Sequence, residues 1–161
     1  MKIGKYDFDF YSWIKKSELV GLDIIDPTHD PVRPELSNEF RKEKGRKIFG
    51  LRYKDEIEGV VCVAYTDDIP TTVKELDLMS KDEGTIAVAY AAWSLKKGAG
   101  KKIMEELLRY MKAKNKVDSV MTLSPLTPMA THFHIRNGAK QVSVNESTQN
   151  FEYSLKAEKN D

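Results

Sequence analysis

The feature that most constrains the fold is an apolar run that leads through a glycine turn into an amphipathic helix. Residues 85–93, TIAVAYAAW, are continuously apolar, which is typical of a strand covered on both faces. KKGAG at 96–100 follows, and GKKIMEELLRYMKAK at 100–114 carries Ile103 and Leu107 on one apolar stripe. The sequence therefore predicts a buried strand, a glycine turn and a helix in direct succession.

Other segments predict further strands and one more helix. Strands are expected at KIFGLRY (47–53), GVVCVAYT (59–66), SVMTL (119–123), AKQVSV (139–144) and NFEYSL (150–155), the first two joined by the acidic turn KDEIE. A helix should begin after Thr127, with Pro128 in its first position, and end at Gly138. We expect residues 1–45 to form a variable N-terminal helical part and residues 156–161 to be a disordered tail.

Size and composition limit the chain to one domain and exclude some partners. With 161 residues and 40% hydrophobic content, we expect a single domain over residues 1–161. The 26 basic and 25 acidic residues leave a net charge of +1, which gives no global attraction to nucleic acid or to a membrane. No apolar run approaches the roughly 20 residues that span a bilayer, so a cytoplasmic protein is expected. Cys62 stands alone, which excludes an intramolecular disulfide.

The KKGAG turn is the first candidate site. A glycine turn between a buried strand and a helix exposes backbone N–H groups at the positive end of the helix dipole, where they can hold a phosphate. Gly98 and Gly100 allow close approach to the main chain. The surrounding lysines are Lys96, Lys97, Lys101 and Lys102. The alternative is a tight connection with solvated lysines. The third glycine of a dinucleotide fingerprint and the GK[ST] ending of a P-loop are missing.

Polar residues in the C-terminal third are further candidates. His132 and His134 lie about 200° apart around the expected helix, so only His134 lies beside the apolar arc that faces the sheet. Ser124 stands where a strand gives way to a turn, a usual place for a reactive side chain, and Tyr153 lies in the last strand. Each also has a structural alternative: a core histidine, a turn serine and a packed tyrosine. Opposed histidines without an acid at ligand spacing argue against a metal site.

This succession of strand, glycine turn, helix, strand, helix and closing hairpin resembles the GNAT acyltransferase superfamily. The resemblance implies an α/β (α+β) fold with a mixed, mostly antiparallel central sheet and helices on both faces. It also implies that a coenzyme A thioester, malonyl-CoA or acetyl-CoA, is bound as substrate with its pyrophosphate on the KKGAG turn. The implied coenzyme A contacts are Ala91, Ala92, Lys96, Lys97, Gly98, Ala99, Gly100, Lys101 and Lys102.

Four motifs resemble a narrower group, the C-terminal catalytic domain of malonyl-CoA decarboxylase. They are VAYTDDIP (63–70), TLSPL (122–126), FHIRNGA (133–139) and NFEYSL (150–155), in the same order as in that domain. The likeness runs from about Arg46 to Tyr153. In that family the serine of the S-P turn and the histidine of the following helix are catalytic, and a tyrosine of the closing strand assists. The resemblance therefore implies Ser124, His134 and Tyr153 as catalytic residues, and decarboxylation of malonyl-CoA to acetyl-CoA and CO2.

Departures from the decarboxylases keep two alternatives open. The chain lacks their long insertion before the histidine helix, the glutamate of their glycine turn and their N-terminal association domain. One alternative is a GNAT-type N-acetyltransferase that moves an acetyl group to an amine, with Tyr153 protonating the leaving thiolate. Its acceptor pocket would lie near Tyr11, Trp13 or residues 70–84. The other is an inactive CoA-binding module, which the missing glutamate favours.

Overall fold

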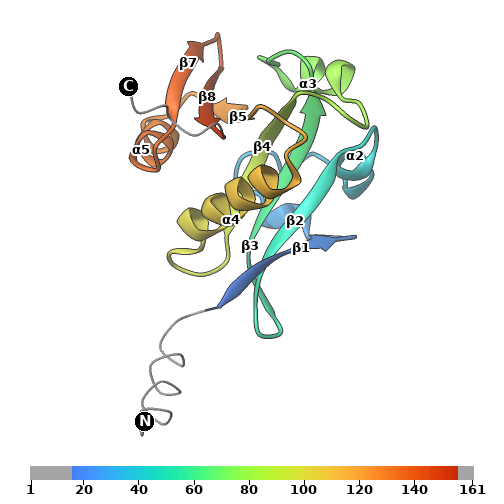
Figure 1. Ribbon diagram of the computed structural model, residues 1–161, viewed down its shortest axis with the longest axis vertical. Helices are drawn as coiled ribbons and strands as arrows, with labels where there is room; N and C mark the ends of the chain where they lie inside the picture. The colour runs from blue at the N-terminus through green and yellow to red at the C-terminus, as the bar shows by residue number, and fades with distance from the viewer. Residues whose placement is uncertain (1–15, 156–161) are drawn as a thin grey trace, which may run out of the picture.

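The computed structural model describes residues 16–155, which contain one eight-stranded sheet (Figure 1). Its strands are β1 (Ser17–Leu22), β2 (Lys47–Tyr53), β3 (Glu56–Thr66), β4 (Ile86–Ser94), β5 (Ser119–Thr122), β6 (Ser124–Pro125), β7 (Lys140–Val144) and β8 (Thr148–Ser154). The order in space is β1-β2-β3-β4-β5-β8-β6, and β7 pairs with β8. Only β4 and β5 run parallel among these pairs, because α4 connects them as a crossover.

All the helices of the described residues except α4 are preceded by a residue whose side chain caps the first turn. They are the 3-10 helix η1 (Pro27–His29), α2 (Asn38–Lys42), α3 (Val73–Met79), α4 (Ala99–Lys114) and α5 (Pro128–Arg136). Ser37, Thr72 and Thr127 each accept a hydrogen bond from a backbone N–H in the first turn of α2, α3 and α5. The helix α4 lacks such a side-chain cap, because its N-cap residue is Gly98.

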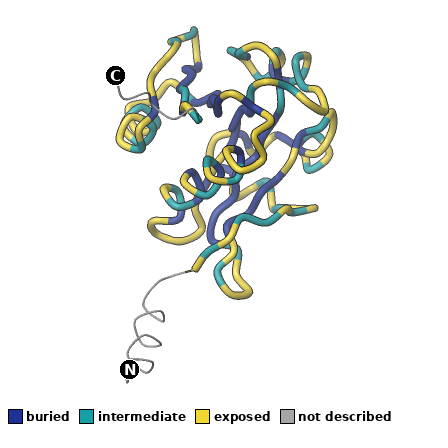
Figure 2. Tube along the Cα trace, in the orientation of Figure 1, coloured by how far each residue is buried: buried dark blue, intermediate teal, exposed yellow. Residues whose placement is uncertain are grey.

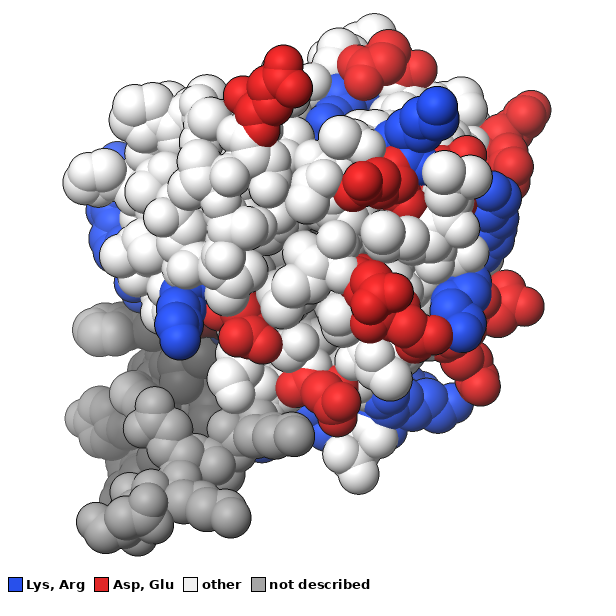
Figure 3. All heavy atoms as spheres, turned by 90° about the horizontal axis from the view of Figure 1, so that it is seen from above, with Lys and Arg blue, Asp and Glu red and all other residues white. Residues whose placement is uncertain are grey.

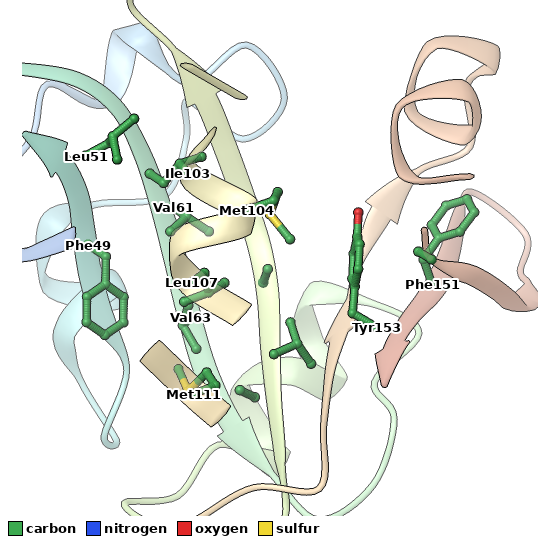
Figure 4. Packing of buried hydrophobic residues seen from close by; sticks show 14 of the residues in the cluster. Phe49, Leu51, Val61, Val63, Ile103, Met104, Leu107, Met111, Phe151 and Tyr153 are labelled. Carbon is green, nitrogen blue, oxygen red and sulfur yellow. The ribbon is translucent and has the colours of Figure 1, made fainter. Parts of the chain in front are cut away.

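Helices cover both faces of the sheet. On one face Ile103, Leu107 and Met111 of α4 pack on the strands, together with Phe133 of α5 (Figure 4). On the other face Leu76 of α3 belongs to a second buried cluster. Burying one such side chain stabilises the fold by about 1.5–3 kcal/mol relative to leaving it exposed. The burial map shows the central strands as the buried layer between exposed helical surfaces (Figure 2).

The sheet opens between β4 and β5. Their parallel pairing ends at Ala89 and Thr122, where the Leu123 N–H donates to the Ala89 carbonyl at 3.1 Å. Beyond this point no strand of the described residues pairs with the β5 side of residues 90–94. A register shift at Cys62 and Val63 of β3 leaves Tyr90 as an extra residue in β4. The split therefore leaves main-chain groups of β4 without a strand partner on the β5 side at the point where β4 bulges.

The structure confirms the predicted strands, the strong helix at residues 99–114 and the helix that Thr127 caps. Within residues 1–45 the helical expectation is wrong for Ser17–Leu22, which pair with β2 as a strand. Residues before 16 and the tail 156–161 lie outside the described part. Pro125 pairs with Thr148 in the two-residue edge strand β6, where no N–H is needed. Within the described residues, no helix is long and apolar enough to span a membrane.

Candidate functional site

The turn before α4 is an open cradle of backbone N–H groups. Gly98 has φ +84, a left-handed conformation that glycine adopts without strain, and a Cβ there would meet nothing within 4 Å. The N-cap Gly98 offers no side-chain acceptor, and the Ala99 N–H donates to the Lys96 carbonyl at 3.1 Å, so the amides of Gly100 and Lys101 are the donors available to an anion. Lys96 pairs with Glu56 at 3.1 Å and Lys102 with Glu106 at 3.4 Å. Basic and acidic side chains are interspersed on the face in Figure 3, so an anion must be held locally.

Gly100 lets α5 approach the start of α4. A Cβ at this position would lie 3.0 Å from Ser94 Oγ and 3.4 Å from Phe133 Cε1. A distance of 3.0 Å is about the shortest that Cβ atoms show to other heavy atoms, and 3.4 Å is at the short end of ordinary van der Waals contact. Glycine at this position therefore allows the ring of Phe133 in α5 to lie against the first turn of α4.

A groove of about 290 Å³ runs between α4 and the segment that follows α5. Its lining residues are Lys101, Met104, Glu105, Leu108, Arg136, Asn137, Gly138 and Tyr153. Lys101 belongs to the first turn of α4, next to the glycine cradle, whereas Tyr153 comes from β8. Figure 4 shows Tyr153 on the side of β8 that faces α4. The groove thus links the cradle to one of the predicted catalytic side chains.

His134 and Tyr153 form a hydrogen-bonded pair at the end of this groove. His134 Nδ1 and Tyr153 Oη lie 2.8 Å apart, and the imidazole packs against Phe151 with ring centres 5.0 Å apart. Burial lowers the pKa of His134 to about 4 and raises the pKa of Tyr153 above its usual value. Both groups are therefore neutral at neutral pH. The predicted orientations are confirmed, since His134 faces the sheet and His132 is exposed.

Ser124 lies apart from this pair. Its side chain is buried, and its Oγ lies 2.8 Å from Thr122 Oγ1. Ser124 pairs with Gln149 of β8, which stands four residues before Tyr153, so the two sites along that strand are roughly 13 Å apart. No contact between Ser124 and His134 is present. The structure therefore joins two of the three predicted catalytic residues and places the serine in β6, two residues past the end of β5.

The predicted contacts on β4 flank the split in the sheet. Ala92 is exposed, while Ala91 is buried on the face that carries Tyr90 and Trp93. Sequence analysis missed a residue that reaches this place, Arg33. Its Nε donates to the Tyr90 carbonyl at 2.9 Å, and its Nη2 donates to the Leu123 carbonyl at 3.1 Å. The only sequence signal is an arginine in a proline-rich loop, which does not indicate a contact with distant strands.

The described residues contain neither a cluster of candidate metal ligands nor a reactive thiol. No group of three or more His, Cys, Asp or Glu side chains in residues 16–155 could hold a metal ion. Cys62 is fully buried, and burial raises the pKa of its thiol to about 11, so it is not a nucleophile. The polar chemistry of the described site therefore rests on hydroxyl, imidazole and guanidinium groups.

Sequence comparison finds no matching protein-family model and no matching curated protein. Solved structures do match. The GNAT-like decarboxylase GphF in complex with isobutyryl-CoA has a TM-score of 0.69 at 11% identity, over 86% of this chain and 100% of that one. The loading GNATL domain of CurA from Lyngbya majuscula has a TM-score of 0.66 at 17% identity, over 87% and 98%. An acetyltransferase of Bacillus subtilis in complex with CoA has a TM-score of 0.60 at 10% identity, over 86% and 99%.

The narrower likeness to malonyl-CoA decarboxylase is weaker in three dimensions. The enzyme from Cupriavidus metallidurans is 20% identical over 74% of this chain and 33% of its own, with a TM-score of 0.47. A match at that level carries no argument about the reaction, so decarboxylation stays a prediction. The matches of higher TM-score, together with the mixed sheet and its helices on both faces, confirm the predicted fold class. The chain has the GNAT fold.

Proposed function

We propose that this protein binds an acyl-CoA in the groove between α4 and α5 and decarboxylates malonyl-CoA to acetyl-CoA and CO2. The observation that carries the proposal is the neutral, hydrogen-bonded His134–Tyr153 pair, because Tyr153 lines a groove that also reaches Lys101, beside the open glycine turn. Solved proteins of the same fold contain CoA or isobutyryl-CoA, and one of them is a GNAT-like decarboxylase, which supports the choice of ligand and reaction.

The cradle would hold the pyrophosphate of the thioester. The uncapped amides at the start of α4 donate to the phosphate oxygens, and Lys97 and Lys101 add positive charge beside them. The acyl end then reaches the split between β4 and β5. Main-chain N–H groups near Ala91 and Ala92, past the last pairing of β4 with β5, would face the thioester oxygen, where negative charge develops.

Loss of CO2 breaks the bond between the carboxylate carbon and the α-carbon, and its electron pair forms a thioester enolate. In the proposed mechanism, Tyr153 Oη gives its proton to the α-carbon of the enolate. His134 then relays a proton: Nδ1–H passes to the phenolate while Nε2 takes up a proton from solvent, so the imidazole stays neutral and one proton is consumed for each CO2 released. This direction of transfer needs the Nδ1–H tautomer of His134, in which the imidazole donates to Tyr153.

The low pKa of His134 favours this reaction over amine acylation. An N-acetyltransferase must remove a proton from an ammonium acceptor at neutral pH, and a histidine with a pKa of about 4 is a weak base for that step. Decarboxylation needs no such base, because carbon–carbon cleavage supplies the electrons. It needs a proton donor afterwards, which a neutral tyrosine with a raised pKa provides.

Ser124 remains a predicted catalytic residue on the strength of the family resemblance. Its hydroxyl bonds to Thr122 at the edge of the split, beside the carbonyl of Leu123 that Arg33 binds. A substrate carboxylate entering the split could accept from this pair of hydroxyls. Ser124→Ala should then weaken malonyl-CoA turnover while CoA affinity changes little.

The test is incubation of the purified protein with malonyl-CoA and no acceptor, followed by chromatography of the CoA esters. Acetyl-CoA should accumulate in the wild type and fall to background in His134→Ala. A parallel reaction with acetyl-CoA and a set of amines measures thiol release. Amine-dependent thiol release without any acetyl-CoA from malonyl-CoA would establish the acetyltransferase alternative. CoA binding with neither activity would establish the inactive module.

A further inference from the structure

Arg33 places a buried guanidinium in the split between β4 and β5. The residue is 8% exposed and comes from the loop between η1 and α2, far from both strands in sequence. Its two hydrogen bonds go to the carbonyls of Tyr90 and Leu123, which lie just past the last pairing of β4 with β5. The guanidinium therefore bridges the two strands where they separate.

One edge of this guanidinium is unused. Nε and Nη2 donate to main-chain carbonyls, while Nη1 has no acceptor among the described residues. Some side-chain nitrogens of the described residues are sealed from solvent and have no hydrogen-bond partner, but Arg33 Nη1 is not one of them. This nitrogen thus keeps an accessible edge at the split, with N–H groups free to donate to a ligand.

The other buried arginines have carboxylate partners. Arg41 Nη1 lies 2.9 Å from Asp30 Oδ2, and Arg46 Nη1 lies 3.1 Å from Asp77 Oδ1. The second oxygen of Asp30 accepts from the backbone N–H groups of Val32 and Arg33 at 3.0 Å, so it does not reach the Arg33 guanidinium. No carboxylate of residues 16–155 lies within ion-pair distance of that guanidinium.

A buried charge without a counterion is costly, and a negatively charged ligand would relieve that cost. Burial lowers the pKa of Arg33, and the charges of Asp30 and Glu35, which are not within ion-pair distance, offset this only in part; the group stays protonated. Main-chain carbonyls satisfy two of its donors but do not neutralise it. The free edge therefore selects for a small anion at the open end of the split.

We propose that Arg33 binds the terminal carboxylate of the acyl group, so that the protein selects thioesters of short dicarboxylic acids over thioesters of simple fatty acids. This rests on the proposed function, because the groove must first deliver the acyl end to the split. A guanidinium donates to carboxylates in charge-assisted hydrogen bonds, which are stronger than hydrogen bonds between neutral groups. Arg33 breaks and forms no bond of the substrate: it is a specificity-determining residue.

Two inert ligands of matched shape test this. 2-Carboxyethyl-CoA is a thioether that keeps the carboxylate at the position it has in malonyl-CoA and cannot lose CO2. Propyl-CoA replaces that carboxylate with a methyl group. Isothermal titration calorimetry on the wild type should show about 10- to 100-fold tighter binding of 2-carboxyethyl-CoA, the range expected for one hydrogen bond to a charged group.

Two variants assign the preference to its residue. Arg33→Gln keeps an amide donor for one of the strand carbonyls but removes the charge, and it should bind both ligands with the affinity of propyl-CoA. Arg109→Gln removes an exposed charge on α4, paired with Glu106 at 2.7 Å, and should keep the full preference. Thermal unfolding shows whether each variant is folded. If Arg33→Gln does not fold, Arg33→Lys takes its place: one ammonium cannot donate to both strand carbonyls and the ligand, so the preference for 2-carboxyethyl-CoA should fall.

Each outcome has a distinct meaning. Equal affinities of the wild type for the two ligands overturn the role of Arg33 and leave CoA binding intact. A preference that survives in Arg33→Gln overturns it as well, because the carboxylate is then held elsewhere. If neither ligand binds at all, the proposed acyl-CoA site itself fails, and the inference about Arg33 fails with it.

Discussion

The hydroxyl of Tyr153 carries the proton chemistry of the proposed reaction. It lies 2.8 Å from His134 Nδ1 and lines the groove, so Tyr153→Phe removes the donor and keeps the ring. We expect acetyl-CoA formation from malonyl-CoA to slow by about 100-fold or more, the usual contribution of one general acid. CoA affinity, measured by calorimetry, should change little.

The matched control is Tyr65→Phe. Burial raises the pKa of Tyr65 to about 12, and its hydroxyl contacts Met111 Sδ at 3.9 Å, outside the groove. This variant should retain wild-type turnover. Equal activity of Tyr153→Phe and wild type would remove Tyr153 from the mechanism.

The pKa of His134 predicts a pH-dependent loss of stability. Because burial holds the folded-state pKa at about 4, below the 6.5 of a free imidazole, the unfolded chain takes up the proton first as the pH falls. The stability contributed by neutral His134 is complete above pH 6.5 and is lost progressively toward pH 4. The loss approaches about 3 kcal/mol.

Urea unfolding of the wild type and His134→Gln, at about pH 7 and about pH 4.5, measures this difference. The wild type should lose about 2–3 kcal/mol more than the variant, which cannot take up that proton. His132→Gln, at an exposed position, should behave like the wild type. Parallel pH profiles of wild type and His134→Gln would show that the imidazole is not buried in its neutral form.

Sequence reasoning places some site residues well and others poorly. Helical periodicity is a local property, so it correctly turns His134 toward the sheet and His132 toward solvent. The partner of a buried hydroxyl depends on strand register instead. The bonds of Ser124 to Thr122 and of Arg33 to two strand carbonyls arise from pairings across the sheet, which no local pattern encodes.

At the scale of elements, the turn before α4 depends on the left-handed backbone of Gly98. Space beside it is open, so conformation alone limits substitution. Gly98→Val should destabilise the fold by about 1–2 kcal/mol and weaken CoA binding, because a β-branched residue resists φ +84. Gly98→Asn should keep both properties close to wild type, since asparagine tolerates this region.

Denaturant unfolding and CoA calorimetry on these two variants give the comparison. Because both variants add a side chain but only valine resists the left-handed backbone, the comparison distinguishes the effect of backbone conformation from the effect of adding a side chain. Equal CoA affinities of the two variants would show that the conformation of Gly98 does not shape the cradle.

Helices and strands with a clear apolar periodicity in their own sequence were predictable, and elements that form only through pairing with a distant strand were not. Residues 99–114 form a helix because an apolar stripe and the absence of an interior proline both favour one. The apolar residues of Ser17–Leu22 follow neither the helical nor the strand period clearly. The segment is a strand because it pairs with β2, for example Leu19 with Leu51. The split after Ala89 likewise depends on where two distant strands stop pairing.

At the scale of the whole molecule, α4 holds one face of the sheet in place. Leu107 is fully buried in the cluster that α4 forms with the strands, so Leu107→Ala should lower the free energy of unfolding by about 2–5 kcal/mol. Leu78→Ala, at a position 71% exposed, should change it by less than about 0.5 kcal/mol. Denaturant unfolding measures both, and similar small effects would contradict the described core.

The fold class was predictable because the order of elements survives low sequence identity, whereas the reaction depends on a few atoms. Structures that match at 10% to 17% identity include an acetyltransferase and a decarboxylase on the same architecture. In the proposed mechanism of this chain, those atoms are the imidazole nitrogens of His134 and the hydroxyl of Tyr153.

The most direct test of the groove is an amide NMR titration of the wild-type protein with CoA. The proposed site predicts saturable shifts of the N–H signals of Gly98, Gly100 and Lys101, with smaller shifts near Tyr153. A second cavity of about 440 Å³ at the far end of α4, which Tyr65 helps to line, should show none. Shifts confined to that second cavity, or no shifts at the glycine turn at saturating CoA, would contradict an acyl-CoA site between α4 and α5.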